Sequence, residues 1–175
     1  MVGDRLEAFA NGGDHSYYHN RADGPWGSYV LDEVIPTATR TYDLDPRRVA
    51  IGGFSMGGFG ALDLARFRRF CAVGGHSAAM WRTGSETPQG AFDDAEDFEQ
   101  NDVLEAAAAN PRLYGKAKVW IDVGTEDPFR SADEELARRL AGEHFVLWKG
   151  GHDISHLEDE APQVMKFYAD ALERC

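Results

Sequence analysis

A serine flanked by glycines stands between a strand-forming segment and a helix-forming segment, and this junction constrains the fold most strongly. Residues 49–53 are typical of a buried strand, and residues 56–67 are typical of a helix. Gly53-Phe54-Ser55-Met56-Gly57 joins the two without a loop. A strand that turns directly into a helix requires a strained residue and small neighbours, as in a nucleophile elbow.

Apolar strand-forming segments and helix-forming segments alternate along the rest of the chain. We predict strands at 72–75, 119–123 and 144–148, and helices at 132–140 and 161–172. This alternation is typical of an α/β fold with a mostly parallel sheet and helices on both faces. With 175 residues and no repeat or linker, the sequence predicts a single domain.

The sequence also predicts where two helices begin and where the chain leaves the sheet. Ser28 is expected to cap a helix that Pro36 would kink or shorten. Pro162 is expected in the first turn of the last helix. Residues 79–101 show no clear periodicity and are expected to form an excursion above the sheet, in the usual place of a lid or substrate-binding insertion.

The chain is acidic, with a formal net charge of −12. We therefore expect no nucleic-acid partner, because no basic stripe is available to displace counterions. The densest acidic stretch, residues 93–99, lacks the pattern of a calcium loop and is expected to be a solvated loop or helix face. No apolar run is long enough to span a bilayer. Residues 1–5 show no signal segment, which favours a cytoplasmic location, although a processed secreted protein would begin similarly.

The chain has two cysteines, at positions 71 and 175. Cys71 opens an apolar run and is expected to be a small buried hydrophobic residue. Cys175 is the last residue and is expected to be frayed. Because there is no Cys-x-x-Cys pair, we expect no metal site and no cofactor.

Ser55 is the predicted nucleophile. The first amides of the following helix would point toward its oxygen, where negative charge develops during acyl transfer. The alternative is a glycine-rich turn that only packs or binds phosphate, but a Walker-type lysine and Gly-x-Gly-x-x-Gly are both absent. Ser77 lacks the second glycine and is expected to be structural or to line the pocket.

His152 is the predicted general base, because it lies in a glycine-rich loop directly after a late strand. His144 begins that strand, and His156 is expected in the first turn of the last helix. In a fold with a nucleophile elbow the acid and then the histidine follow the serine along the chain, whereas His15 and His19 precede it.

Asp127 is the predicted acid that orients the base. It follows the strand at 119–123, whereas Asp122 lies inside that strand. Glu126 and Asp153 are neighbouring alternatives, but Pro128 positions Asp127 after the turn, and Asp153 is adjacent to the base in sequence.

Several segments together resemble the putative-esterase branch of the α/β-hydrolases, the group that contains esterase D and the mycolyltransferases. They are residues 52–62, 122–127 and 150–153, with 11–18 and 26–29 upstream. The resemblance implies Ser55, Asp127 and His152 as a triad, and the amide of Met56 as one oxyanion donor. Such relatives cleave carboxylic or thiol esters, or transfer the acyl group to an alcohol.

The same resemblance gives expectations for the substrate pocket. Its residues are expected to include Tyr18, Trp26, His76 and Trp81. The expected partner is a small-molecule ester with a short or aromatic acyl group. An acyltransferase with the same triad and a non-catalytic binding module of this fold are the alternatives.

The chain departs from the family pattern at its front. Family members carry strands before the matched stretch, including one that donates the second oxyanion amide, whereas residues 6–10 here are a poor strand. We expect Gly12 or Gly13 to supply that amide instead. The strand before Ser55 would keep an unpaired edge, covered either by the N-terminal segment or by a second copy in a homodimer.

Overall fold

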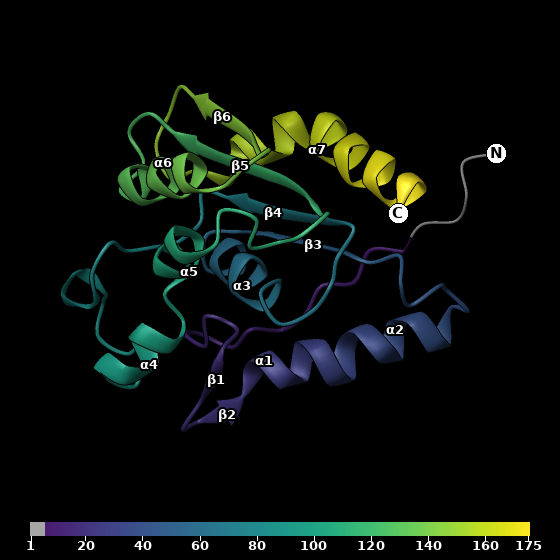
Figure 1. The fold of residues 1–175 in the computed structure, drawn as a ribbon, viewed down its shortest axis with the longest axis horizontal. Coiled ribbons are helices and arrows are strands. Elements are labelled where there is room, and N and C mark those ends of the chain that lie inside the picture. The colour runs from purple at the N-terminus through teal and green to yellow at the C-terminus, as the bar shows by residue number, and fades with distance from the viewer. Residues whose placement is uncertain (1–5) are drawn as a thin grey trace.

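The computed structural model describes residues 6–175, and a four-stranded parallel sheet forms its centre (Figure 1). The strands lie in the order β3-β4-β5-β6. Their bounds are β3 Ala50–Phe54, β4 Ala72–His76, β5 Lys118–Gly124 and β6 His144–Trp148. A two-residue antiparallel pair, β1 (Asn20–Arg21) with β2 (Gly24–Pro25), lies apart from this sheet. The fold is therefore α/β with a parallel sheet and helices around it, as predicted.

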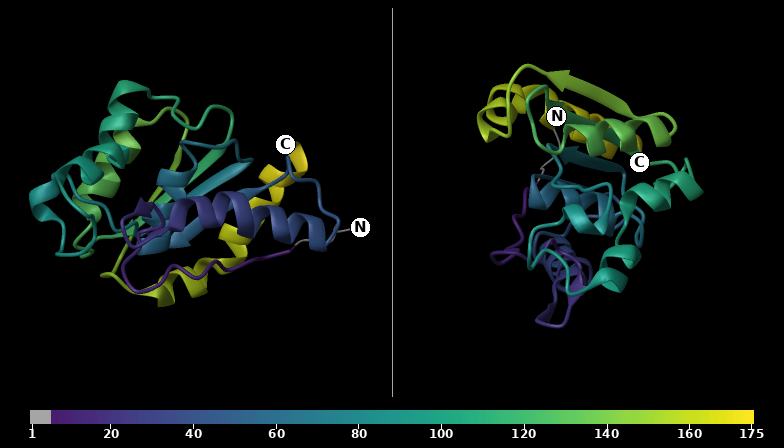
Figure 2. Two further views of the ribbon diagram at one scale, coloured as in Figure 1. Left: turned by 90° about the horizontal axis from the view of Figure 1, so that it is seen from below. Right: turned by 90° about the vertical axis from the view of Figure 1, so that its left-hand side faces the viewer.

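Helices surround the sheet. They are α1 Trp26–Ser28, α2 Ile35–Thr41, α3 Met56–Leu64, α4 Ala95–Gln100, α5 Val103–Ala109, α6 Arg130–Arg139 and α7 Ile154–Arg174. The helix made by α1, a π-helical segment and α2 lies on the side away from β6 (Figures 1 and 2). Among the described residues no helix is long and apolar enough to cross a membrane.

Glycines in the two strands nearest the serine allow helices to pack closely on both faces of the sheet. On one face, a Cβ at Gly75 would lie 2.6 Å from the Leu62 side chain of α3. On the other face, the Tyr168 hydroxyl of α7 occupies the space over Gly52 and Gly74. Leu62 is fully buried at the centre of the core. Small strand residues thus bring α3 and the sheet close together beside Ser55.

The first helix differs from its expected form. It begins at Trp26, so Ser28 is helical and does not cap it; its hydroxyl accepts a hydrogen bond from Asn20. Pro36 does not end the helix, which continues to Thr41. The π-helical segment Tyr29–Val34 ends two positions before this proline, whose missing N–H disturbs the regular bonding of the preceding turn.

The last helix begins earlier than predicted, at Ile154, so that only Asp153 separates it from His152. Asp153 caps α7 through its side chain, which accepts a hydrogen bond from the Ser155 amide at 2.9 Å. Pro162 therefore lies in the helix interior and not in the first turn. The cap fixes the end of the loop that carries His152.

Residues between β4 and β5 form the expected excursion, which contains a 3₁₀ turn at Gly84–Glu86, α4 and α5. Its acidic stretch is mostly exposed, on a loop and on α4, as expected, but two of its carboxylates also make contacts. Asp93 accepts hydrogen bonds from Arg21 and from the Ala22 amide, and Asp97 pairs with buried His19 at 3.0 Å. These carboxylates fasten the excursion to the N-terminal segment.

Cys71 and Cys175 form a disulfide, so the expectation of a frayed C-terminus is wrong. Cys71 is buried, as predicted, at the start of β4. The bond ties the end of α7 to the sheet. Disulfides persist mainly in oxidising compartments, and the location of the chain stays a prediction.

The strand that leads to Ser55 lies at an edge of the sheet. Among residues 6–175, β3 pairs only with β4, and residues 6–10 adopt no strand. The described N-terminal segment therefore does not fill the edge, and residues 1–5 lie outside the described residues. Coverage by a second copy of the chain stays a prediction.

Candidate active site

Ser55 lies at the junction of β3 and α3 in a strained conformation. Its φ and ψ are 55° and −117°, outside the regions that residues with a side chain usually adopt. Its amide donates to the His76 carbonyl at 3.0 Å, and its carbonyl accepts from the amides of Phe59 and Ala79, each at 3.0 Å. These bonds to β4, α3 and the following loop hold the serine at the elbow.

The two glycines of the motif have different roles. A Cβ at Gly53 would lie 2.5 Å from the carbonyl carbon of Gly57, so a side chain there would collide with the backbone. A Cβ at Gly57 would meet nothing within 4 Å. The expectation that both glycines are needed for close packing is therefore correct only for Gly53.

His152 reaches the serine from the loop after β6. Its Nε2 lies 2.8 Å from the Ser55 Oγ, which is hydrogen-bond distance. Its Nδ1 lies 2.9 Å from Asp127 Oδ2. Because a carboxylate can only accept, Nδ1 carries the hydrogen and Nε2 is left to accept the serine proton.

Asp127 is held in the turn between β5 and α6. Its side chain is fully buried, and its Oδ1 accepts from the Phe129 amide at 2.8 Å. Phe129 was not among the residues predicted from the sequence, although an aspartate two residues before it is typical of an Asx turn. Of the rejected acids, Asp122 pairs with His76 and Asp153 caps α7. Ser55, His152 and Asp127 thus form one hydrogen-bonded row.

Another carboxyl, that of Asp133 in α6, is fully buried and close enough to Asp127 to feel its charge. Burial raises its pKa well above the usual value, and the negative charges of Asp127 and Asp122 raise it further. This shift favours the protonated, neutral form of Asp133 over the carboxylate.

The expected oxyanion donors make different contacts. Met56 is the first residue of α3, where backbone amides have no partner within the helix. The Gly13 amide donates to the Asn11 side chain at 3.0 Å, so it is not free for an oxyanion in this structure. Gly12 is buried against the Tyr18 ring. The roles of Met56 and Gly12 stay predictions.

Comparison with known families places this site in context. The model of the family described as "Putative esterase" matches residues 7–153, which is most of the chain and includes all three residues of the row. The chain belongs to this esterase family. The match confirms the resemblance that the sequence motifs indicated.

A search of curated proteins found no match for this esterase chain. Among solved structures, it is similar to a ferulic acid esterase, with a TM-score of 0.75 and 20% identity over 88% of this chain and 64% of that one. An S-formylglutathione hydrolase from Agrobacterium tumefaciens gives 0.69 and 20%, over 89% and 63%. FphF, a fluorophosphonate-binding serine hydrolase of Staphylococcus aureus, gives 0.71 and 20%, over 90% and 69%. The chain thus spans less than two thirds of the first two proteins, and these likenesses show the fold.

The expected pocket residues lie at different distances from the hydrogen-bonded row. Trp81 packs edge-to-face on Phe129 at 5.5 Å, and Phe129 packs on His152 at 5.2 Å, so Trp81 is linked to the base through one ring. Tyr18 instead lies against Gly60 of α3 and donates to the Ala10 carbonyl. This contact fastens the N-terminal segment to α3.

Trp26 and His76 also make contacts within the fold. The Trp26 indole donates to Asp23 at 3.0 Å and covers Gly13. His76 is buried on the α7 face of the sheet, where its Nδ1 pairs with Asp122 at 2.5 Å and its Nε2 lies 3.0 Å from the Tyr168 hydroxyl. These three polar groups join β4, β5 and α7 beneath the elbow, so His76 acts there as a structural residue.

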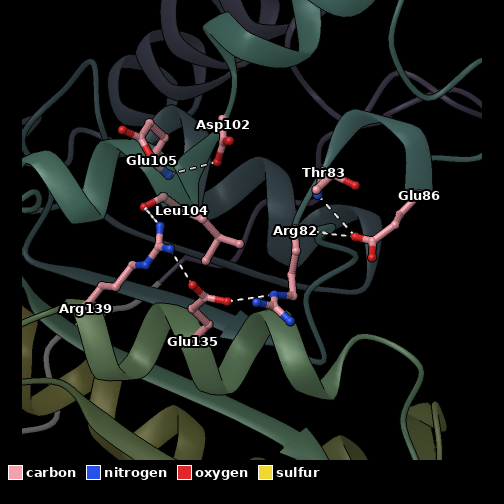
Figure 3. Close-up of a pocket in the computed structure, with 8 residues that line it drawn as sticks. All are labelled: Arg82, Thr83, Glu86, Asp102, Leu104, Glu105, Glu135 and Arg139. Carbon is pink, nitrogen blue, oxygen red and sulfur yellow. Dashed lines mark hydrogen bonds and ion pairs between the residues drawn. The ribbon is translucent and has the colours of Figure 1, made fainter.

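A separate cleft of about 370 Å³ lies between the excursion and α6 (Figure 3). Its eight lining residues include none of the triad: Arg82, Thr83, Glu86, Asp102, Leu104, Glu105, Glu135 and Arg139. Glu135 lies between the guanidinium groups of Arg82 and Arg139 and pairs with both. Both arginines that line the cleft are therefore paired with Glu135, and neither is left as an unpaired guanidinium for a ligand.

Proposed function

We propose that this chain hydrolyses carboxylic esters of short or aromatic acyl groups through an acyl-enzyme on Ser55. The observation that carries the proposal is the row of hydrogen bonds from the Ser55 hydroxyl through His152 to buried Asp127. This row supplies a nucleophile, a base and a group that orients the base. The family match over residues 7–153 supports the same reaction class.

The first half of the reaction acylates the serine. As Ser55 Oγ attacks the ester carbonyl carbon, its proton passes to His152 Nε2, and the carbonyl oxygen becomes an oxyanion beside the first amides of α3. The carbon–oxygen bond to the alcohol then breaks, and the alcohol leaves with the proton from Nε2. Asp127 stabilises the imidazolium in between without accepting its proton.

The second half releases the acid. A water molecule gives a proton to His152 Nε2 and attacks the acyl carbon, and the ester bond to Ser55 Oγ breaks as Nε2 returns the proton to that oxygen. An alcohol in place of water would make the chain an acyltransferase. The aromatic contacts from His152 through Phe129 to Trp81 support an aromatic acyl group, and a ferulic acid esterase of the same fold is in line with this.

A series of p-nitrophenyl acyl esters tests the proposal. The wild type should release nitrophenol, and Ser55→Ala should lower kcat by as much as about 10⁶-fold, as loss of a triad nucleophile does. A missing second oxyanion donor would lower the wild-type rate by about 10²–10³-fold without abolishing it. Product analysis with added alcohol distinguishes hydrolysis from transfer. Equal rates for wild type and variant would favour a non-catalytic binding module.

A further inference from the structure

The imidazole of His152 packs against two phenyl rings. Phe54 stacks on it, with ring centroids 4.8 Å apart and an interplanar angle of 30°. Phe129 meets it edge-to-face, with centroids 5.2 Å apart and an angle of 73°. Both phenylalanines are partly buried, and the imidazole retains 27% side-chain exposure. The rings therefore cover much of the base without sealing it from substrate.

Both rings come from the segments that supply the other two triad residues. Phe54 is the last residue of β3 and immediately precedes Ser55. Phe129 immediately precedes α6, and its amide donates to Asp127. Each ring thus lies next in the chain to, or is hydrogen-bonded to, one of the two residues that the base contacts.

The loop that carries His152 has few side chains of its own to fix the imidazole. Gly150 and Gly151 precede the histidine, and Gly150 has a φ of 150°, which residues with a side chain rarely adopt. The position of the imidazole therefore depends on its hydrogen bonds and on the two phenyl rings that pack against it, which are those of Phe54 and Phe129.

The stacked ring also has an electrostatic effect. Acyl transfer turns the neutral imidazole into a cation, and the face of a phenyl ring within about 6 Å attracts a cation. Among residues 6–175, the charged group in contact with the imidazole is the Asp127 carboxylate, at the Nδ1 edge of the ring. Phe54 instead presents its face to the ring plane, so the two interactions do not compete.

We propose that Phe54 is a positioning residue for His152, which holds the imidazole against Ser55 and stabilises its protonated form during acyl transfer, with Phe129 as the second phenyl ring against it. This inference rests on the proposed function and deepens it. It assigns a role to the variable position before the serine in the Gly-x-Ser-x-Gly motif. A merely structural Phe54 would support the elbow but would leave the proton affinity of the base unchanged.

The test measures how the reaction of Ser55 depends on pH. A fluorophosphonate probe reports this without an ester of known specificity, because Ser55 Oγ bonds to phosphorus, fluoride leaves, and His152 takes the hydroxyl proton. Phe54→Leu removes the π face and keeps an apolar side chain, and Phe54→Tyr restores the face. Phe67→Leu is the matched control, since Phe67 is 63% exposed beyond the far end of α3.

We expect Phe54→Leu to lower the plateau labelling rate about threefold and to move the acidic limb of the pH–rate profile about 0.5 unit toward lower pH. The shift has this sign because the protonated ring loses a stabilising contact and releases its proton more readily. Phe54→Tyr should return both values to within about twofold and 0.2 unit of wild type, and Phe67→Leu should change neither. Phe54→Met serves in place of Phe54→Leu if the latter unfolds, as judged by circular dichroism.

Two failures can be told apart. If wild type shows no labelling or ester cleavage that depends on Ser55, the proposed function itself is wrong. If wild type reacts normally but Phe54→Leu keeps the acidic limb in place, or Phe54→Tyr does not restore it, only the role of Phe54 is refuted.

Discussion

Opening the disulfide between Cys71 and Cys175 is expected to destabilise the fold strongly while leaving the reaction centre assembled. The bond joins residues 104 positions apart in the sequence. Closing a loop of about 100 residues removes unfolded-state entropy worth about 4.7 kcal/mol at 25 °C. For a chain of this size each kcal/mol corresponds to about 2–4 °C in melting temperature, so reduction should lower it by roughly 10–20 °C.

The assay is thermal unfolding followed by circular dichroism, with and without dithiothreitol. Cys175→Ala is the matched variant, because position 175 is exposed and the change leaves the buried Cys71 in place. It should melt like the reduced wild type and should not respond to dithiothreitol. At 20 °C it should retain ester cleavage, since the bond lies at the opposite end of α7 from His152.

Two results would refute this reasoning. One is a melting temperature that falls by less than about 2 °C after thiol titration has shown the bond to be open. The other is titration of two free thiols in the native oxidised protein, which would mean that the bond does not form.

Two further predictions follow from the glycines at the elbow and from a buried carboxyl in α3. Gly53→Ala places a Cβ 2.5 Å from the Gly57 backbone and should lower the free energy of unfolding in urea by about 1–3 kcal/mol. Gly57→Ala, with open space around it, should change that free energy by less than about 0.5 kcal/mol. Equal losses would contradict the conclusion that only Gly53 is needed for close packing. Burial raises the pKa of Asp63 to about 7 from 3.8, so the folded protein keeps this proton between pH 4 and 7 while the unfolded chain has lost it. Asp63 should therefore make the free energy of unfolding decrease as pH rises across this range. Asp63→Asn should remove this contribution in urea titrations from pH 4.5 to 7.5. If wild type and variant show the same dependence of unfolding free energy on pH, Asp63 is ionised in the fold.

The sequence predicted the parts of this molecule that depend on local pattern. All four strands of the sheet lie within one residue of their expected bounds, because short apolar runs near glycines are distinctive. Ser55 and His152 were identified by their position after a strand. In α/β folds of this type the carboxyl ends of parallel strands meet at one edge of the sheet, so the order of the loops was enough to bring the two residues together.

The features that the sequence did not predict depend on distant partners. Nothing in the local pattern pairs Cys71 with the last residue of the chain. The start of α7 was misplaced because Asp153 was considered as a neighbour of the base and not as a helix cap. The buried group of His76, Asp122 and Tyr168 joins three elements, so its members gave no common signal in the sequence.

The strand that carries the nucleophile also forms the margin of the described sheet. Ser55 therefore has lateral backbone support from one neighbour, through the carbonyl of His76. A foreign peptide laid along the other side of β3 would run one strand spacing, about 4.8 Å, from the backbone that leads to the reacting serine. If the chain catalyses the proposed reaction, a peptide that pairs with this margin in a chosen register is expected to alter its turnover from outside the reaction centre.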